Sequence, residues 1–183
     1  MNVSYVFLAN GFEEIEALTV VDVLRRAGMK VKTMSINEDC NVTGAHGIKV
    51  IADAVLADEK IDSAEWLIAP GGMPGSMNLH NCEKLSTLLK KQADKGGKVA
   101  AICAAPAFVL APLGILDGKE ATCYPGCENG FTDKVTRKDA PVVKDGNIIT
   151  ANGPASALLF ALAIVETSLG ETAAQEIGAA MLH

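Results

Sequence analysis

Residues 99–106 read VAAICAAP, and this short stretch decides the fold expected for the chain. An apolar run stops abruptly at Cys103, small residues follow, and Pro106 opens a second apolar run over 107–113. The pattern predicts a buried strand, a tight turn and a helix, with Cys103 on the turn. Enzymes hold nucleophiles in this strained position at the edge of a parallel sheet. The start of the helix would also offer free N–H groups and a positive dipole end, which favour a thiolate.

The overall composition limits the class of protein. The chain has 183 residues, 49% of them hydrophobic, so one domain over residues 1–183 with a full core is expected. A net charge of -6 argues against nucleic acid or an anionic membrane as a main partner. The sequence has neither an apolar run of the ~20 residues that cross a bilayer nor the basic start of a secretory signal. Five cysteines without a framework pattern favour reduced thiols in the cytoplasm.

Segments with strand and helix patterns alternate along the chain. Strands are expected at 3–9, 31–36, 66–69, 98–102 and twice within 141–150. Helices are expected at 13–27, 82–95, 156–169 and 171–182. The segment 39–53 alternates around two glycines and predicts a small hairpin. This order implies an α/β sandwich with a mainly parallel sheet and right-handed connections.

Functional sites in such sheets form beyond the carboxyl ends of the strands. Three segments are expected there: the loop after the first strand, the Gly71-Gly72 loop after Ala69, and Cys103. A glycine pair allows a backbone N–H to approach a reacting centre closely. Together with the N–H of Ala104, this loop could form an oxyanion hole.

Four motifs carry a family resemblance: NGFEEIE at 10–16, APGG at 69–72, AAICAAP at 100–106 and NGP at 152–154. In their order and spacing the chain resembles the ThiJ/PfpI superfamily (the DJ-one family), closest to its parkinsonism-associated deglycase and glyoxalase subgroup. The resemblance implies a flavodoxin-like three-layer sandwich and usually a homodimer. It also implies cytoplasmic roles in carbonyl detoxification and oxidative-stress response.

The resemblance also assigns residues to a site. The family's nucleophilic cysteine matches Cys103, and its buried acid, which hydrogen-bonds that cysteine, matches Glu16. Its backbone donors for an oxyanion match the N–H groups of Gly72 and Ala104. Many animal members place a histidine near the cysteine, and this chain departs from that pattern because Tyr124 stands at the matching position.

Glu16 lies one residue after Ile15 and two before Leu18, on the side of the helix that reads as apolar. A carboxyl there is either a functional group of raised pKa or a partly buried, ion-paired acid. An ionised Glu16 would raise the pKa of Cys103 by repulsion, whereas a protonated Glu16 could donate a hydrogen bond to the sulfur. We therefore expect a coupled pair, with the proton on Glu16 and the charge on Cys103.

The other cysteines and the histidines receive lesser roles. Cys123 and Cys127 flank Tyr124 in a Pro-Gly loop, where one thiol could resolve an oxidised Cys103. The spacing of histidines and cysteines predicts no metal site. Expected at the surface are two first-turn acids and all three histidines: Glu13, Glu14, His46, His80 and His183.

Two functions fit these residues. In the first, a cofactor-independent glyoxalase or deglycase, Cys103 adds to the aldehyde of methylglyoxal or glyoxal and Glu16 shuttles protons, which yields lactate or glycolate. In the second, a redox sensor or chaperone, peroxide oxidises Cys103 to a sulfinate that Glu16 stabilises. A glutaminase triad is excluded because only His183 follows Cys103. Proteolysis is disfavoured because the peptidase branch has a histidine at the position of Ala104.

Overall fold

The computed structural model describes residues 2–183 and is built on a seven-stranded sheet, in the order β10-β11-β7-β6-β1-β2-β5. In that order its strands are Val142–Asp145, Ile148–Ala151, Lys98–Ile102, Trp66–Ala69, Ser4–Leu8, Val31–Ser35 and Ala54–Val55. All neighbours pair in parallel except β10 with β11. The predicted mainly parallel sheet is confirmed, and the order of its parallel strands is the flavodoxin-like one.

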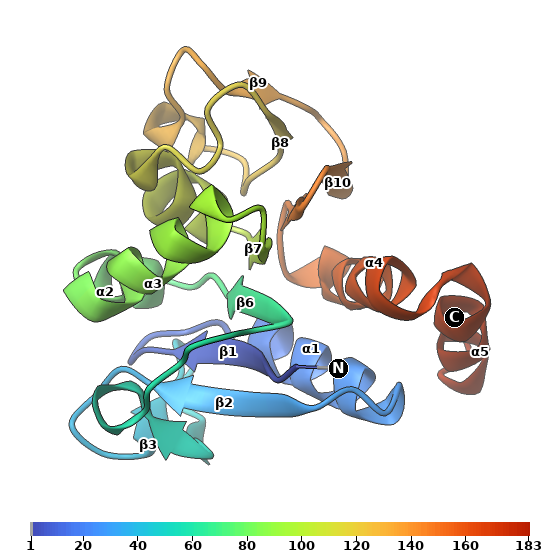
Figure 1. Cartoon of the computed structure of the whole chain (residues 1–183), viewed down its shortest axis with the longest axis horizontal. Coiled ribbons are helices and arrows are strands. Elements are labelled where there is room, and N and C mark those ends of the chain that lie inside the picture. The colour runs from blue at the N-terminus through green and yellow to red at the C-terminus, as the bar shows by residue number, and fades with distance from the viewer. Residues whose placement is uncertain (1) are drawn as a thin grey trace.

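Helices cover both faces of this sheet (Figure 1). On one face α1 (Glu14–Arg26) packs against α4 (Ala157–Leu169), and α5 (Glu171–Ala180) packs on α4. On the other face lie α2 (Gly75–His80) and α3 (Glu83–Asp94). The three-layer sandwich expected from the sequence is therefore confirmed.

Two hydrophobic cores form because strand side chains point alternately to opposite faces. In β1, Val6 and Leu8 join the core under α1 and α4, whereas Tyr5 and Phe7 join the core on the opposite face. Burial on both faces explains why the central strands read as unbroken apolar runs.

Two small strand pairs lie outside the main sheet. The antiparallel pair β3 (Asn41–Thr43) and β4 (Lys49–Ile51) confirms the hairpin predicted within 39–53. It is tied to the loop after β1, because the N–H of Gly11 donates to the carbonyl of Thr43 at 2.8 Å. The parallel pair β8 (Glu120–Ala121) and β9 (Thr136–Arg137) was not predicted.

The helix expected over 107–113 is present, but it is not a regular α-helix. The chain forms a single π-type turn over Pro106–Leu110 and one 3-10 turn over Ala111–Leu113. Pro112 lies inside this segment and has no N–H to continue a helical ladder. The short α2 and β5 were also missed.

The apolar face of α1 is turned relative to the expectation. Ile15 is 56% exposed and Leu18 is also exposed, whereas Ala17, Val20 and Leu24 are buried. The first turn of α1 therefore buries acids in place of Ile15, and these acids lie at the carboxyl edge of the sheet.

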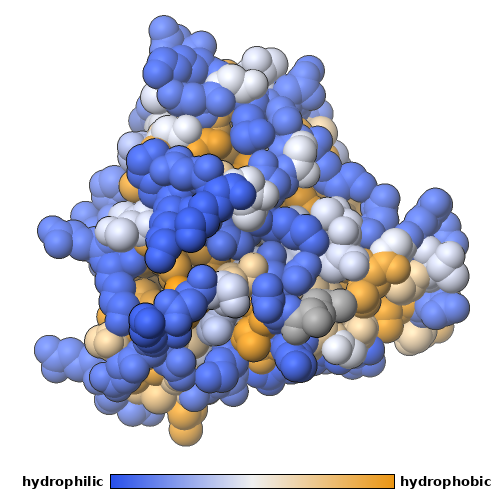
Figure 2. Space-filling model, in the orientation of Figure 1, coloured by the Kyte–Doolittle hydropathy of each residue, from blue (hydrophilic) through white to orange (hydrophobic). Residues whose placement is uncertain are grey.

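The surface seen in Figure 2 is largely hydrophilic, with hydrophobic groups gathered where α4 and α5 lie. Among residues 2–183, no helix combines the length and the apolar character needed to cross a membrane.

Phe160 on α4 is fully buried in the core shared with α1. We expect Phe160→Ala to lower the free energy of unfolding by about 4 kcal/mol, because it removes a buried ring and leaves a cavity. The neighbouring Leu159 is 40% exposed, so Leu159→Ala should cost less than about 1 kcal/mol. Urea denaturation measures both, and equal losses would contradict the assignment of the core.

Candidate active site

Cys103 lies on a strained turn directly after β7. Its φ is 66°, in the left-handed region where a side chain costs about 1–2 kcal/mol. Two hydrogen bonds of 2.8 Å hold this conformation: the Cys103 N–H donates to the carbonyl of Ala151, and the Cys103 carbonyl accepts from the N–H of Tyr124. The predicted strained turn is confirmed, and Cys103 is 8% exposed at its apex.

The predicted oxyanion donors face the Cys103 sulfur. Backbone hydrogen bonds from Gly72 and Ala104 reach this sulfur and act to lower its pKa. Gly71 lies between the two side chains of the site. A Cβ at position 71 would stand 2.5 Å from the Cβ of Cys103 and 2.7 Å from Oε2 of Glu16, so only glycine fits there.

Glu16 is completely buried and faces Cys103 from α1. Its Oε2 accepts a hydrogen bond of 2.7 Å from the N–H of Gly71, whereas Oε1 is buried without a partner among the described residues. Burial raises the pKa of Glu16 to about 7, and the charge of Glu13 acts in the same direction. Hydrogen bonds with Cys103 and Gly71 oppose the rise. Of the two alternatives for Glu16, the raised pKa is supported, and its functional role stays a prediction.

The expected placement of the proton on Glu16 and the charge on Cys103 stays a prediction, because the two groups titrate as one coupled pair. Burial raises the pKa of the thiol well above its usual range, and the neighbouring Glu16 raises it further. The N–H groups of Gly72 and Ala104 offset only part of this effect. Burial thus raises the pKa of both groups, and the two are close enough to share one proton.

Glu13 and Glu14 were expected to be solvated, and both are buried. Nδ1 of His46, on the turn between β3 and β4, lies 2.8 Å from Oε2 of Glu14 and 3.6 Å from Oε2 of Glu13. Burial opposes ionisation, yet hydrogen bonds from His46 lower the pKa of Glu14, and the pKa of His46 rises correspondingly.

One ligand atom from each of Glu13, Glu14 and His46 lies within 4.8 Å of the others, a spacing that a cation could bridge. Nδ1 of His46 lies within hydrogen-bond distance of Oε2 of Glu14. The three side chains therefore contact one another as a cluster of two acids and one imidazole.

The two auxiliary residues, Tyr124 and Cys123, follow β8, and the backbone of Tyr124 is hydrogen-bonded to that of Cys103. Tyr124 contributes its backbone N–H, while its exposed ring lies over Gly153. Cys123 is buried, and burial raises the pKa of its thiol to about 12. The thiol that affects it is that of Cys127, and neither thiol is among the groups that shift the pKa of Cys103. A resolving role for Cys123 or Cys127 stays a prediction.

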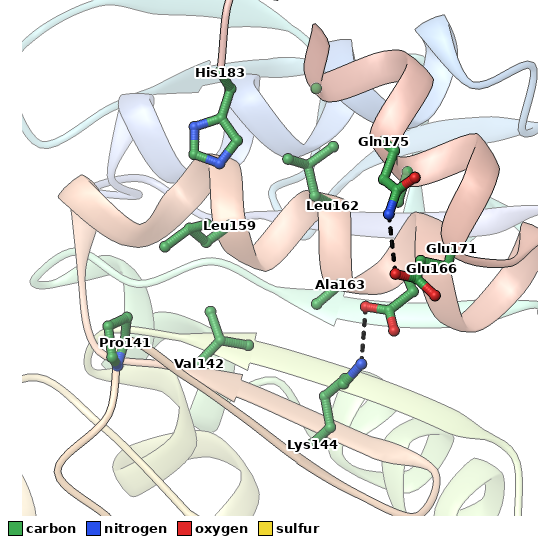
Figure 3. A pocket seen from close by; sticks show the side chains of 12 residues that line it. Pro141, Val142, Lys144, Leu159, Leu162, Ala163, Glu166, Glu171, Gln175 and His183 are labelled. Carbon is green, nitrogen blue, oxygen red and sulfur yellow. Dashed lines mark hydrogen bonds and ion pairs between the residues drawn. The ribbon is translucent and has the colours of Figure 1, made fainter.

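A groove of about 890 Å³ lies elsewhere, between β10 and the helices α4 and α5 (Figure 3). Val142, Leu159 and Leu162 line it, and Nζ of Lys144 meets Oε2 of Glu166 across it at 2.9 Å. None of the predicted site residues lines this groove. Cys103 therefore lies outside this groove.

Comparison with known proteins supports the family resemblance. A profile of the DJ-1/PfpI family matches residues 3–167. Protein dj-1beta from Drosophila melanogaster is 39% identical over 178 residues, which are 97% of this chain and 95% of that protein. Oxidized DJ-1 from Toxoplasma gondii has a similar structure, with a TM-score of 0.96 at 34% identity, covering 100% of this chain and 99% of that one.

Two further relatives differ in length. Protein DJ-1 homolog B from Arabidopsis thaliana is 39% identical over 170 residues, which are 93% of this chain but 39% of that protein. The chain thus spans less than half of this plant relative. A Caenorhabditis elegans protein named glutathione-independent glyoxalase DJR-1.2 is 37% identical over 159 residues, 86% of this chain and 83% of that protein.

The raised pKa of Glu16 has a consequence for stability. Its folded value of about 7 lies above its ordinary 4.5, so the wild type loses stability as the pH rises between these values. We expect Glu16→Gln, which keeps an acceptor for Gly71, to unfold with about 3 kcal/mol more free energy than the wild type at pH 8. At pH 5 the difference should fall below about 1 kcal/mol.

Urea denaturation from pH 5 to 8 measures this difference. The control is Glu176→Gln at an exposed position of α5, which should stay within about 0.5 kcal/mol of wild type at every pH. A gain for Glu16→Gln that is equal at both ends of the range would point to packing and contradict a buried charge.

Proposed function

Because the chain belongs to the DJ-1/PfpI family, we propose that it is a cysteine-dependent enzyme that converts small dicarbonyls to 2-hydroxy acids without a cofactor. The observation that carries the proposal is the buried pair of Glu16 and Cys103, with two backbone N–H groups directed at the sulfur. The relative named as a glutathione-independent glyoxalase, 37% identical to this chain, supports the same activity.

The first step is addition of Cys103 to the aldehyde carbon. With a pKa of about 7, about half of Glu16 is carboxylate at neutral pH and accepts the thiol proton as the S–C bond forms. The π electrons of the carbonyl move to its oxygen. The N–H groups of Gly72 and Ala104, which now face the sulfur, are placed to stabilise the resulting oxyanion. Glu16 passes the proton that it accepted to that oxygen, which gives a hemithioacetal and restores the carboxylate.

The second step moves a proton between neighbouring carbons. Glu16 removes the proton from the former aldehyde carbon, and the carbon–carbon enediol that results is protonated on the adjacent carbon. The product is a thioester of a 2-hydroxy acid on Cys103. Water then attacks the thioester, releasing the acid and restoring the thiol. Methylglyoxal gives lactate and glyoxal gives glycolate, each with net addition of one water.

Limited access to Cys103 favours small substrates. The residue is 8% exposed, and its sulfur lies between the Gly71-Gly72 loop and α1. A free dicarbonyl reaches such a sulfur more readily than a glycated side chain on a folded protein does. We therefore propose glyoxalase activity ahead of deglycase activity, in the cytoplasm, where the five free cysteines would stay reduced.

We expect lactate to form from methylglyoxal without glutathione, and both Cys103→Ser and Glu16→Gln to lower kcat/KM at least about 1000-fold. The first variant removes the nucleophile and the second removes the base. Enzymatic determination of lactate measures the rate. Cys82→Ser, which alters a cysteine outside the site, is the control and should retain the rate.

Absence of lactate with freshly reduced wild-type protein would contradict the enzyme. It would favour the second candidate, a peroxide sensor, for which the spare buried Oε1 of Glu16 is the supporting observation. A protonated Oε1 could donate to an oxygen of Cys103 sulfinate. Intact-mass measurement after peroxide treatment, showing two added oxygens on Cys103, would support that alternative.

We also propose that the protein is a homodimer through one apolar surface. Ile15 and Leu18 on α1 are exposed, as are Ile48 and Ile51 of the β3–β4 hairpin, and Ile51 is 80% exposed. The two groups adjoin, because the N–H of Ile48 donates to Oε1 of Glu14 at 3.4 Å. Such clusters on a surface indicate a protein contact.

Ile51→Lys should convert the dimer to a monomer, because it places a charge in the apolar contact. Sedimentation equilibrium measures the mass. Leu182→Lys, a change at a more exposed apolar residue near the C-terminal end of α5, is the control and should leave the dimer intact. A monomeric wild type would show that this surface serves another purpose.

A further inference from the structure

The turn between β3 and β4 is fastened over the first turn of α1. The N–H groups of His46 and Ile48 donate to Oε1 of Glu14 at 2.8 and 3.4 Å, and the imidazole takes Oε2. The N–H of Ala45 also donates to the carbonyl of Phe12 at 2.8 Å. The Glu14 carboxylate is thus enclosed by the hairpin, and a Cβ on Gly44 would collide with it.

The same turn of α1 holds the Gly71-Gly72 loop. The N–H of Glu13 donates to the carbonyl of Gly71 at 3.0 Å, and the N–H of Gly71 donates to Glu16 at 2.7 Å. Gly72 packs so closely on the backbone N of Glu13 that a Cβ would stand 2.5 Å from it. Any shift of Glu13 is therefore passed to the loop that faces Cys103.

Charge accumulates where these contacts meet. Glu13, Glu14 and Glu16 are buried within one helical turn, and Glu13 repels a charge on Glu16. The carboxylate of Glu13 accepts no hydrogen bond from the described residues, and its nearest cationic partner is His46 at 3.6 Å. The other titratable group that faces Glu16 is the thiol of Cys103, which would add a further negative charge if it ionised. His46 is therefore the basic group placed to offset this cluster, and its pKa is raised by the hydrogen bond to Glu14.

We propose that His46 is a positioning residue of the active site, whose imidazolium fixes the first turn of α1 beneath the Gly71-Gly72 loop and compensates the carboxylates beside Glu16. It acts through Glu13 and Glu14 and does not touch the reacting atoms. This inference rests on the proposed role of Glu16 as the base for Cys103. It gives the chain a functional histidine at a position that the sequence pattern did not indicate.

The proposal predicts the direction in which the pH dependence of the rate shifts when His46 is replaced. Removing the positive charge should hold the proton on Glu16 to higher pH, so the acid limb of the pH–rate profile should move upward. In wild type this limb is expected near pH 7. For His46→Gln we expect a shift of about 0.5 pH unit, or a roughly threefold lower rate at pH 6, with the rate recovered by pH 9. His46→Lys, which keeps a cation, should restore the wild-type limb.

Two rates are followed from pH 5.5 to 9: lactate formation from methylglyoxal, and alkylation of Cys103 by iodoacetamide, located by peptide mass spectrometry. The second rate requires no turnover, so the role of His46 is tested even where lactate is not formed. His183→Gln is the control for loss of an exposed histidine and should leave both profiles unchanged.

A further variant tests the same charge cluster without altering the hairpin. Glu13→Gln removes a negative charge that raises the pKa of Glu16. The acid limb of the pH–rate profile of this variant should therefore move to lower pH. Opposite shifts in His46→Gln and Glu13→Gln would support the proposal. Equal losses at every pH in both His46 variants, or profiles that stay at the wild-type limb, would overturn it and leave His46 as a structural contact alone.

Discussion

The candidate active site depends on the attachment of one glycine to one helical turn. Both backbone groups of Gly71 are bound to α1, the N–H by the carboxyl of Glu16 and the carbonyl by the N–H of Glu13. The opposite side of Gly71 packs against Cys103 so closely that no side chain fits between them. One set of contacts therefore positions the helix, the loop and the strained cysteine. Each of the three takes its place only when the other two are in place.

Much of this arrangement could be predicted from local patterns. The apolar run that ends at Cys103 and the small residues after it indicated the turn, and the structure places a positive φ there. The loop after Ala69 could be assigned to the same edge, because the carboxyl ends of parallel strands gather there. The irregular form of the helix after Cys103 was not predicted, because the apolar run was given more weight than Pro112.

The protonation of the site could not be predicted from spacing. The sequence indicated which N–H groups would face the sulfur, but the raised pKa of Cys103 arises mainly from burial, which depends on the whole fold. The same reason explains Glu13 and Glu14. A first-turn acid is usually solvated, and here a hairpin more than thirty residues further along the chain covers it. Contacts of that sequence separation leave no local pattern.

The burial of Cys123 makes its thiol a built-in reporter of local unfolding. Its thiol follows β8, and burial raises its pKa to about 12, which keeps it protonated. In an unfolded chain a cysteine ionises near its ordinary value of about 8.5 and becomes reactive. The rate at which a thiol reagent modifies Cys123 therefore measures how often this part of the structure opens. No label has to be introduced into the chain.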